Sequence, residues 1–96
     1  MEEITFDFDI EKNRKLKETR GVSFEDIITI IDEKRVLDII EHHNTDAYPN
    51  QKFFVVDIEG YIYFVPFVQN KNTIFLKTIF ASRKGTKRYL SEKKPE

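Results

Sequence analysis

The sequence predicts one α+β domain spanning residues 1–96, with helices packed on a small, mostly antiparallel sheet. Two helix-capping patterns in the first third of the chain predict the helices. A long run of β-branched and aromatic residues around Glu59-Gly60 predicts the sheet. The length of 96 residues, of which 40% are hydrophobic, suits one modest core. The expected order is an N-terminal strand, two helices, a three-stranded meander and a short C-terminal helix.

The N-terminal strand and first helix are predicted from residues 5–20. Residues 5–9 alternate apolar and polar side chains, as in a short strand, and Asp9 is then available to cap a helix. The charged stretch 11–20 ends at Gly21, a common helix stop, and has too few apolar positions to be buried. We therefore expect a surface helix, anchored by Ile10 and Leu16.

A second helix is predicted to begin after Ser23. This serine and Asp26 have the spacing of a capping box, and apolar residues then follow at helical intervals from Phe24 to Ile31. Residues 32–34 close the helix. The next apolar stretch, residues 36–40, could continue the helix or form a strand, and we expect a strand.

The meander follows a predicted loop at residues 44–50. Residues 53–58 and 61–65 form a hairpin around Glu59-Gly60. Pro66 donates no ladder hydrogen bond, so we expect it at an edge, a bulge or a bend.

The end of the chain is predicted to be a third strand and a basic helix. A turn at residues 69–72 leads into a core strand over residues 73–81. Residues 82–90 then form the helix. The run from Ile74 to Lys84 thus delivers a basic cluster to one edge of the domain.

Charge is distributed unevenly along the chain. Residues 70–96 hold eight Lys or Arg and two Asp or Glu, which gives +6, whereas the formal net charge of the whole chain is −1. A basic segment in a near-neutral chain indicates a localised anion-facing patch. The simpler interpretation, a solvated terminus, stays open.

Composition excludes several classes of protein. Without cysteine there is no disulfide framework, thiolate metal site or cysteine nucleophile. No export signal or membrane-length apolar run is recognisable, so we expect a cytoplasmic protein. No phosphate-binding glycine loop or nucleophile-elbow serine is present, and no cofactor is expected.

Two metal hypotheses rest on short clusters. His42 and His43 adjoin Glu41 and Asp46, but adjacent residues of a strand point to opposite faces and do not readily share one ion. A second cluster could hold Mg²⁺, although capping and solvation explain it more simply; it comprises Asp7, Asp9 and Glu11. We expect no metal site.

The remaining chemistry-bearing side chains are basic and aromatic. They are Lys77, Arg83, Lys84, Lys87, Arg88 and Tyr89 near the end, and Lys12, Lys15 and Arg20 in the first helix. RNA cleavage needs no metal, because the neighbouring 2′-hydroxyl attacks the phosphate once a group takes its proton and cations stabilise the developing charge. Arg suits a bidentate phosphate clamp, and Lys or Tyr can transfer protons.

Three segments resemble one family when read in order. Residues 6–13 and 20–26 are similar to the N-terminal signature of the BrnT family of bacterial toxins, which reads Trp-Asp-x-x-Lys-x-x-x-Asn and then Lys-His-Gly-Val-Ser-Phe-Glu. Residues 78–84, with Tyr89 after them, resemble that family's closing Arg-Ile-Ile-Ser-Ala-Arg-x-Ala and its basic-aromatic tail. The usual tryptophan and histidine are absent, which indicates a divergent branch.

The resemblance implies a RelE-like fold and a ribonuclease toxin that an antitoxin neutralises. By position, Phe8 replaces the family's tryptophan, Arg20 its histidine, and Arg83 matches its final arginine, while Lys12 matches its lysine. The first arginine of the closing motif falls at Thr78, or at Lys77 after a slip of one residue. These matches are stronger evidence for the fold than for the catalytic assignment.

The leading hypothesis is a metal-independent endoribonuclease toxin. Its expected catalytic residues are Arg83, Lys77, Arg20, Lys12 and Tyr89, and its expected RNA-binding residues are Lys84, Lys87, Arg88 and Lys15. The expected partners are RNA and a cognate antitoxin, a small ribbon-helix-helix DNA-binding protein. The alternatives are a non-catalytic protein that pairs with an antitoxin or regulator, and metal-dependent hydrolysis through His42, His43 and Asp46.

Overall fold

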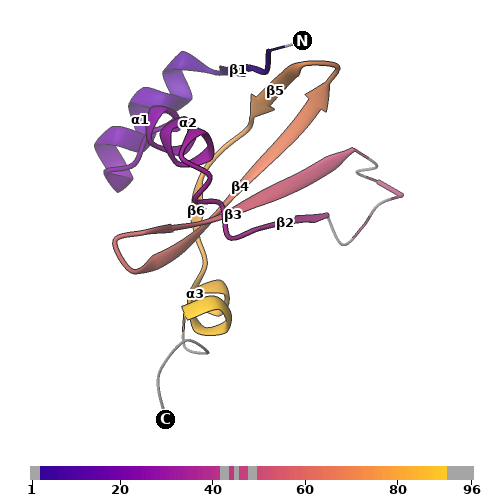
Figure 1. Cartoon of the computed structure of the whole chain (residues 1–96). Helices are drawn as coiled ribbons and strands as arrows, with labels where there is room; N and C mark the ends of the chain where they lie inside the picture. Colours follow the sequence, from indigo (N-terminus) through magenta and orange to yellow (C-terminus); the bar gives the residue numbers. More distant parts are fainter. Residues whose placement is uncertain (1–2, 42–43, 45, 48–49, 91–96) are drawn as a thin grey trace.

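The computed structural model describes residues 3–41, 44, 46–47 and 50–90 (Figure 1). The described residues form β1 (Thr5–Phe8), α1 (Ile10–Arg20), α2 (Phe24–Asp32), β2 (Asp38–Glu41), β3 (Gln51–Ile58), β4 (Tyr61–Asn70), β5 (Thr73–Leu76), β6 (Phe80–Ala81) and α3 (Arg83–Leu90). The predicted α+β class is confirmed, and the sheet is mostly antiparallel.

The sheet has the order β1-β5-β4-β3-β2, and β6 pairs with β4 further along the same strand edge as β5. Only the β1–β5 pair is parallel among the pairs of described strands. The β3–β4 hairpin is the longest ladder, and its two turn residues, Glu59 and Gly60, have φ angles of 53° and 85°. Two positive φ angles are typical of the type I′ turn that suits the twist of a hairpin.

The predicted third strand over residues 73–81 is wrong as a single element. It breaks at residues 77–79 into β5 and β6. The Pro66 carbonyl accepts a hydrogen bond from the Lys77 N–H over 2.8 Å, so the backbone nitrogen of this proline faces the same interruption. The proline therefore lies where its missing N–H leaves no ladder bond unmade.

The two faces of the sheet carry separate apolar layers. One layer packs under α1 and α2, and its strand residues include Phe54, Val56, Val65 and Phe67. Alternate residues point to the other face, where Val55 and Ile62 are fully buried outside that core cluster. Helix α3 lies over this second face and, in Figure 1, far from α1 and α2.

The two N-terminal helices are joined through Asn13, which is only 5% exposed. Its Oδ1 accepts the Phe24 N–H over 2.7 Å, and its Nδ2 donates to Glu25 Oε1 over 2.9 Å. The predicted capping box of Ser23 and Asp26 is present. Asn13 therefore links the first turn of α1 to the first turn of α2.

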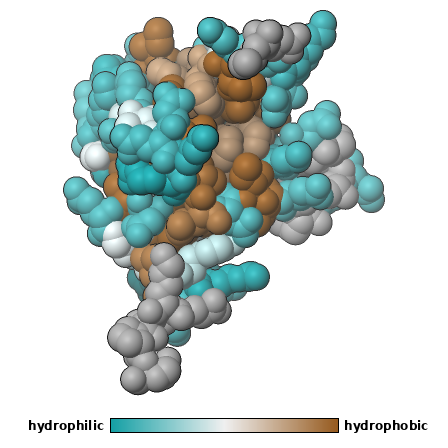
Figure 2. Space-filling model, in the orientation of Figure 1, coloured by the Kyte–Doolittle hydropathy of each residue, from teal (hydrophilic) through white to brown (hydrophobic). Residues whose placement is uncertain are grey.

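The predicted anchors of α1 differ in burial. Leu16 is buried, whereas Ile10 is 76% exposed, so the prediction that Ile10 anchors the helix is wrong. Figure 2 shows hydrophilic side chains over the outer surface of the N-terminal helices and apolar side chains between these helices and the strands. Within the described residues, no helix has the length and apolar character needed to cross a membrane.

Candidate functional site

Ser82 and Thr86 connect helix α3 to the edge of β4 by hydrogen bonds. The Ser82 N–H donates to the Ile62 carbonyl over 2.9 Å, and the Ile62 N–H donates to Thr86 Oγ1 over 2.9 Å. Ser82 Oγ also accepts the Gly85 N–H over 2.9 Å, which caps the first turn of the helix. These bonds fix where the basic side chains of α3 lie on the sheet.

Gly85 lets α3 approach the strand closely. This residue is buried, and a Cβ atom added to it would lie 2.9 Å from Ile62 Cγ2 and 3.1 Å from Phe64 Cε1. At the far end of the helix, the Tyr89 hydroxyl donates to Asp38 Oδ2 over 2.9 Å. Helix α3 therefore crosses the sheet from β4 to β2.

An aromatic cluster of Phe53, Phe64 and Phe80 lies on the same face. Their ring centroids are 5.8 to 6.3 Å apart, and each pair meets edge to face. All three residues are half-buried, so each retains some solvent-accessible surface. Exposed aromatic rings on a sheet are platforms on which unpaired bases stack.

Two predicted RNA-binding cations flank this cluster on the α3 side. Lys84 and Arg88 are exposed and line a hollow of about 330 Å³ between α3 and the strands. The hollow is also lined by Asp38, Ile40, Phe64, Ser82, Gly85 and Tyr89. It therefore combines two cations, one carboxylate, one phenol and the edge of the aromatic cluster.

Lys77 lies on the same face of the sheet, towards the end where β3 begins. Its Nζ is 3.3 Å from Oε1 of Gln51, which precedes Phe53 by two residues and so shares its face. Along β4, Val68 pairs with Gln51 and Pro66 with Phe53, whereas Ile62, nearer the β3–β4 turn, bonds Ser82 at the start of α3. Phe53 and Phe64 therefore lie between the Gln51 end of the sheet, where Lys77 is, and the start of α3. Cations thus lie on this face on both sides of the aromatic cluster.

Arg83 and Lys87 have a different orientation. Both are exposed, and the helical period places them opposite Gly85, on the outer side of α3. Arg83, one of the expected catalytic residues, does not line the hollow that contains Lys84 and Arg88.

The predicted residues of the first helix gather elsewhere. Lys12, Lys15 and Arg20 line a hollow of about 440 Å³ with Thr78, on the side of the sheet that carries α1. The Arg20 Nη1 donates to the Ile79 carbonyl over 2.9 Å. This arginine therefore holds the break between β5 and β6, and the predicted site is divided between two surfaces.

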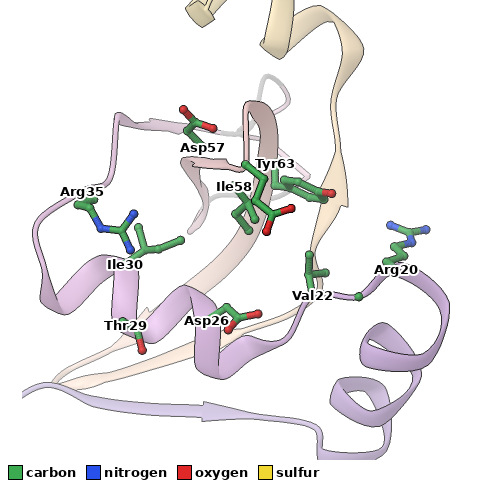
Figure 3. A pocket seen from close by; sticks show the side chains of 11 residues that line it. Arg20, Val22, Asp26, Thr29, Ile30, Arg35, Asp57, Ile58 and Tyr63 are labelled. Atoms are coloured by element: carbon green, nitrogen blue, oxygen red, sulfur yellow. The ribbon is translucent and has the colours of Figure 1, made fainter.

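Figure 3 shows a further hollow, of about 420 Å³, between α2 and the β3–β4 turn, with Arg20 and Arg35 at opposite ends. Three of its polar groups already serve the fold. Asp26 belongs to the capping box, Asp57 Oδ1 accepts the N–H of Gly60, and Arg35 Nε donates to Glu33. We regard this hollow as a weaker candidate site.

The described residues contain no group of three or more metal-ligating side chains. Asp9, from the suggested Mg²⁺ cluster, caps α1 by accepting the N–H groups of Glu11 and Lys12 over 2.9 and 3.3 Å. His42 and His43 lie outside the described residues, so the structure does not bear on that pair.

Sequence reasoning missed Asp38, and it read the three phenylalanines of the aromatic cluster only as sheet-forming residues. Asp38 belongs to a short edge strand, and its pairing partner Val55 and its hydroxyl donor Tyr89 are far from it in sequence. Only the long-range pairing of β2 with β3 brings this carboxylate to α3.

Comparisons with known proteins leave the site to be judged by its geometry alone. No protein-family model matches the chain, and neither a curated protein nor a solved structure matches it.

Proposed function

We propose that this chain is a metal-independent endoribonuclease toxin of a type II toxin-antitoxin system. The BrnT-like segments of the sequence motivate a RelE-like fold for it, acting in the cytoplasm. The toxin cleaves RNA and stops translation and growth until its antitoxin binds.

The observation that carries the proposal is the arrangement on the α3 face of the sheet. The half-buried rings of Phe53, Phe64 and Phe80 lie between Lys77 and the two cations of the α3 hollow, Lys84 and Arg88. Stacking rings with cations on both sides suit a single strand, whose bases are unpaired and whose phosphates are negative. A duplex hides its bases and cannot use the rings in this way.

Cleavage on this face follows from the same groups. Lys84 and Arg88 hold the scissile phosphate and stabilise the negative charge that develops on its oxygens. Stacking on the aromatic cluster turns the attacked nucleotide towards them, which supplies the orientation that a 2′-hydroxyl attack needs.

Growth on induction tests the proposal. We expect arrest and fragmented messenger RNA when the chain is expressed alone, and recovery when the adjacent gene is expressed with it. A Lys84→Ala/Arg88→Ala variant at equal protein level should permit growth. Normal growth and intact RNA with the wild-type chain would contradict the proposal.

A second candidate function is a non-catalytic partner protein of the same fold, which pairs with an antitoxin or a DNA-binding regulator. The edge strand β2 favours it, because Ile39 and the adjoining Leu37 are 53% and 38% exposed. An exposed apolar edge strand is a site at which another chain adds a strand. This function predicts stable binding to the product of the adjacent gene without any RNA cleavage.

A further inference from the structure

We infer that Asp38 is the group that takes the proton from the attacking 2′-hydroxyl of RNA, and that Tyr89 positions it. This inference rests on the ribonuclease activity proposed above and names the proton acceptor within the same site. Neither the BrnT-like segments nor the basic composition of the chain's end points to this carboxylate.

The composition of the α3 hollow identifies Asp38 as the acceptor. Lys84 and Arg88 donate protons and accept none while they are charged. The Ser82 hydroxyl already accepts the Gly85 N–H. Among the described residues that line this hollow, Asp38 is the only carboxylate, and it is exposed to an incoming strand.

Two hydrogen bonds hold the Asp38 carboxylate in one orientation. Its Oδ1 accepts the Ile39 N–H over 2.8 Å, and its Oδ2 accepts the Tyr89 hydroxyl over 2.9 Å. Each oxygen keeps a second lone pair, so either one can accept the proton of a substrate. A group held on both oxygens meets the requirement that a general base stay within hydrogen-bonding reach of the proton it removes.

Charge in the hollow is compatible with an acidic residue beside a phosphate. Lys84 and Arg88 together outweigh Asp38 by one positive charge. The cations therefore still attract the phosphate, while the carboxylate lies within the same hollow to accept a proton.

The reaction balances without a metal or a second reagent. The 2′-oxygen gives its proton to Asp38 and forms a bond to phosphorus, and the bond from phosphorus to the 5′-oxygen breaks. The 5′-oxygen takes a proton from water, and Asp38 returns its proton to solvent. The products are a 2′,3′-cyclic phosphate and a 5′-hydroxyl.

Asp38→Asn tests the inference, because the amide oxygen can still accept from Tyr89 while the charge is lost. We expect its cleavage rate on a single-stranded oligoribonucleotide to fall by about 100-fold or more. Binding to the 2′-O-methyl form of that oligonucleotide, which cannot react, should stay within about threefold. Asp7→Asn is the matched control, because Asp7 likewise accepts the N–H of the next residue, over 2.8 Å, on the distant edge strand β1. Its rate should equal that of the wild type.

The outcomes separate the inference from the function on which it rests. A wild-type chain that cleaves no RNA overturns both. A wild-type chain and an Asp38→Asn variant that cleave equally overturn the inference alone, as does an Asp38→Asn variant that loses binding as well as cleavage. Tyr89→Phe gives an independent result: kcat should fall while KM is unchanged, and an unchanged kcat would overturn its positioning role.

Discussion

Gly85 of α3 lies so close to Ile62 of β4 that a Cβ atom on the glycine would fall 2.9 Å from the isoleucine Cγ2. Real Cβ atoms essentially never approach that closely, and Phe64 Cε1 at 3.1 Å closes the other side. The approach brings Lys84 and Arg88 of the helix into the hollow that Phe64 also lines. The position of the candidate site therefore depends on a residue without a side chain.

Gly85→Ala should destabilise the protein by about 1–3 kcal/mol, because the added methyl group overpacks the contact with β4. On an exposed helix the same change would stabilise the protein by about 1 kcal/mol through helix propensity. The sign of the change in the free energy of unfolding therefore distinguishes a close contact from an exposed position. Thermal unfolding measures it. Lys87→Ala, on the outer side of α3, is the control and should change stability by less than about 0.5 kcal/mol.

Arg20→Ala should cost about 1–3 kcal/mol, since it removes the charged donor to the Ile79 carbonyl at the break between β5 and β6. Arg14→Ala is the comparison, because Arg14 makes only exposed ion pairs with Glu11 and Glu18 within α1. That change should cost less than about 1 kcal/mol. Equal losses in urea unfolding would show that the Arg20 contact has no special role.

Glu25 makes stability depend on acid pH. The side-chain amide of Asn13 donates to this carboxyl and lowers its pKa from the ordinary 4.5, and Lys17, at 3.6 Å, acts in the same direction. A lowered pKa in the folded state adds stability above pH 4.5, which is lost as pH falls through the folded pKa. Glu25→Gln should therefore show a smaller drop in Tm than the wild type between about pH 5 and about pH 2. Parallel curves would contradict this assignment.

Phe80→Leu should weaken binding of single-stranded RNA. Loss of a stacking ring costs about 1–3 kcal/mol per base, which is roughly 5- to 150-fold in Kd. Phe6→Leu, a half-buried ring packed against the core under α1 and α2, is the matched control and should leave Kd unchanged. Titrations of a 2′-O-methyl oligonucleotide at fixed salt measure both. An equal Kd for all three proteins would exclude stacking on this face.

The elements that the sequence predicted well depend on local signals. The capping box at Ser23 and the turn at Glu59-Gly60 specify α2 and the β3–β4 hairpin within a few residues, so the fold class followed from them. The break between β5 and β6 depends instead on Pro66, which lies in another strand. No sequence pattern within residues 73–81 predicts the contact of this segment with Pro66.

The candidate site was only partly predictable for the same reason. Composition identified the basic residues and Tyr89, but neither the phenylalanine cluster nor the face on which each side chain would lie. Arg20 and Arg83 both belong to the expected catalytic set, but Arg20 lies in α1 and Arg83 on the outer side of α3. Asp38 carries no local signal, because only the pairing of β2 with β3 brings it to Tyr89.

Cleavage of RNA by the purified chain tests the central claim most directly. The wild-type protein, incubated with single-stranded RNA and a chelator, should yield fragments that end in a 2′,3′-cyclic phosphate. The Lys84→Ala/Arg88→Ala variant, folded to the same extent, should yield none. RNA that stays intact with the wild-type protein, or cleavage that the chelator abolishes, would contradict a metal-independent ribonuclease on the α3 face.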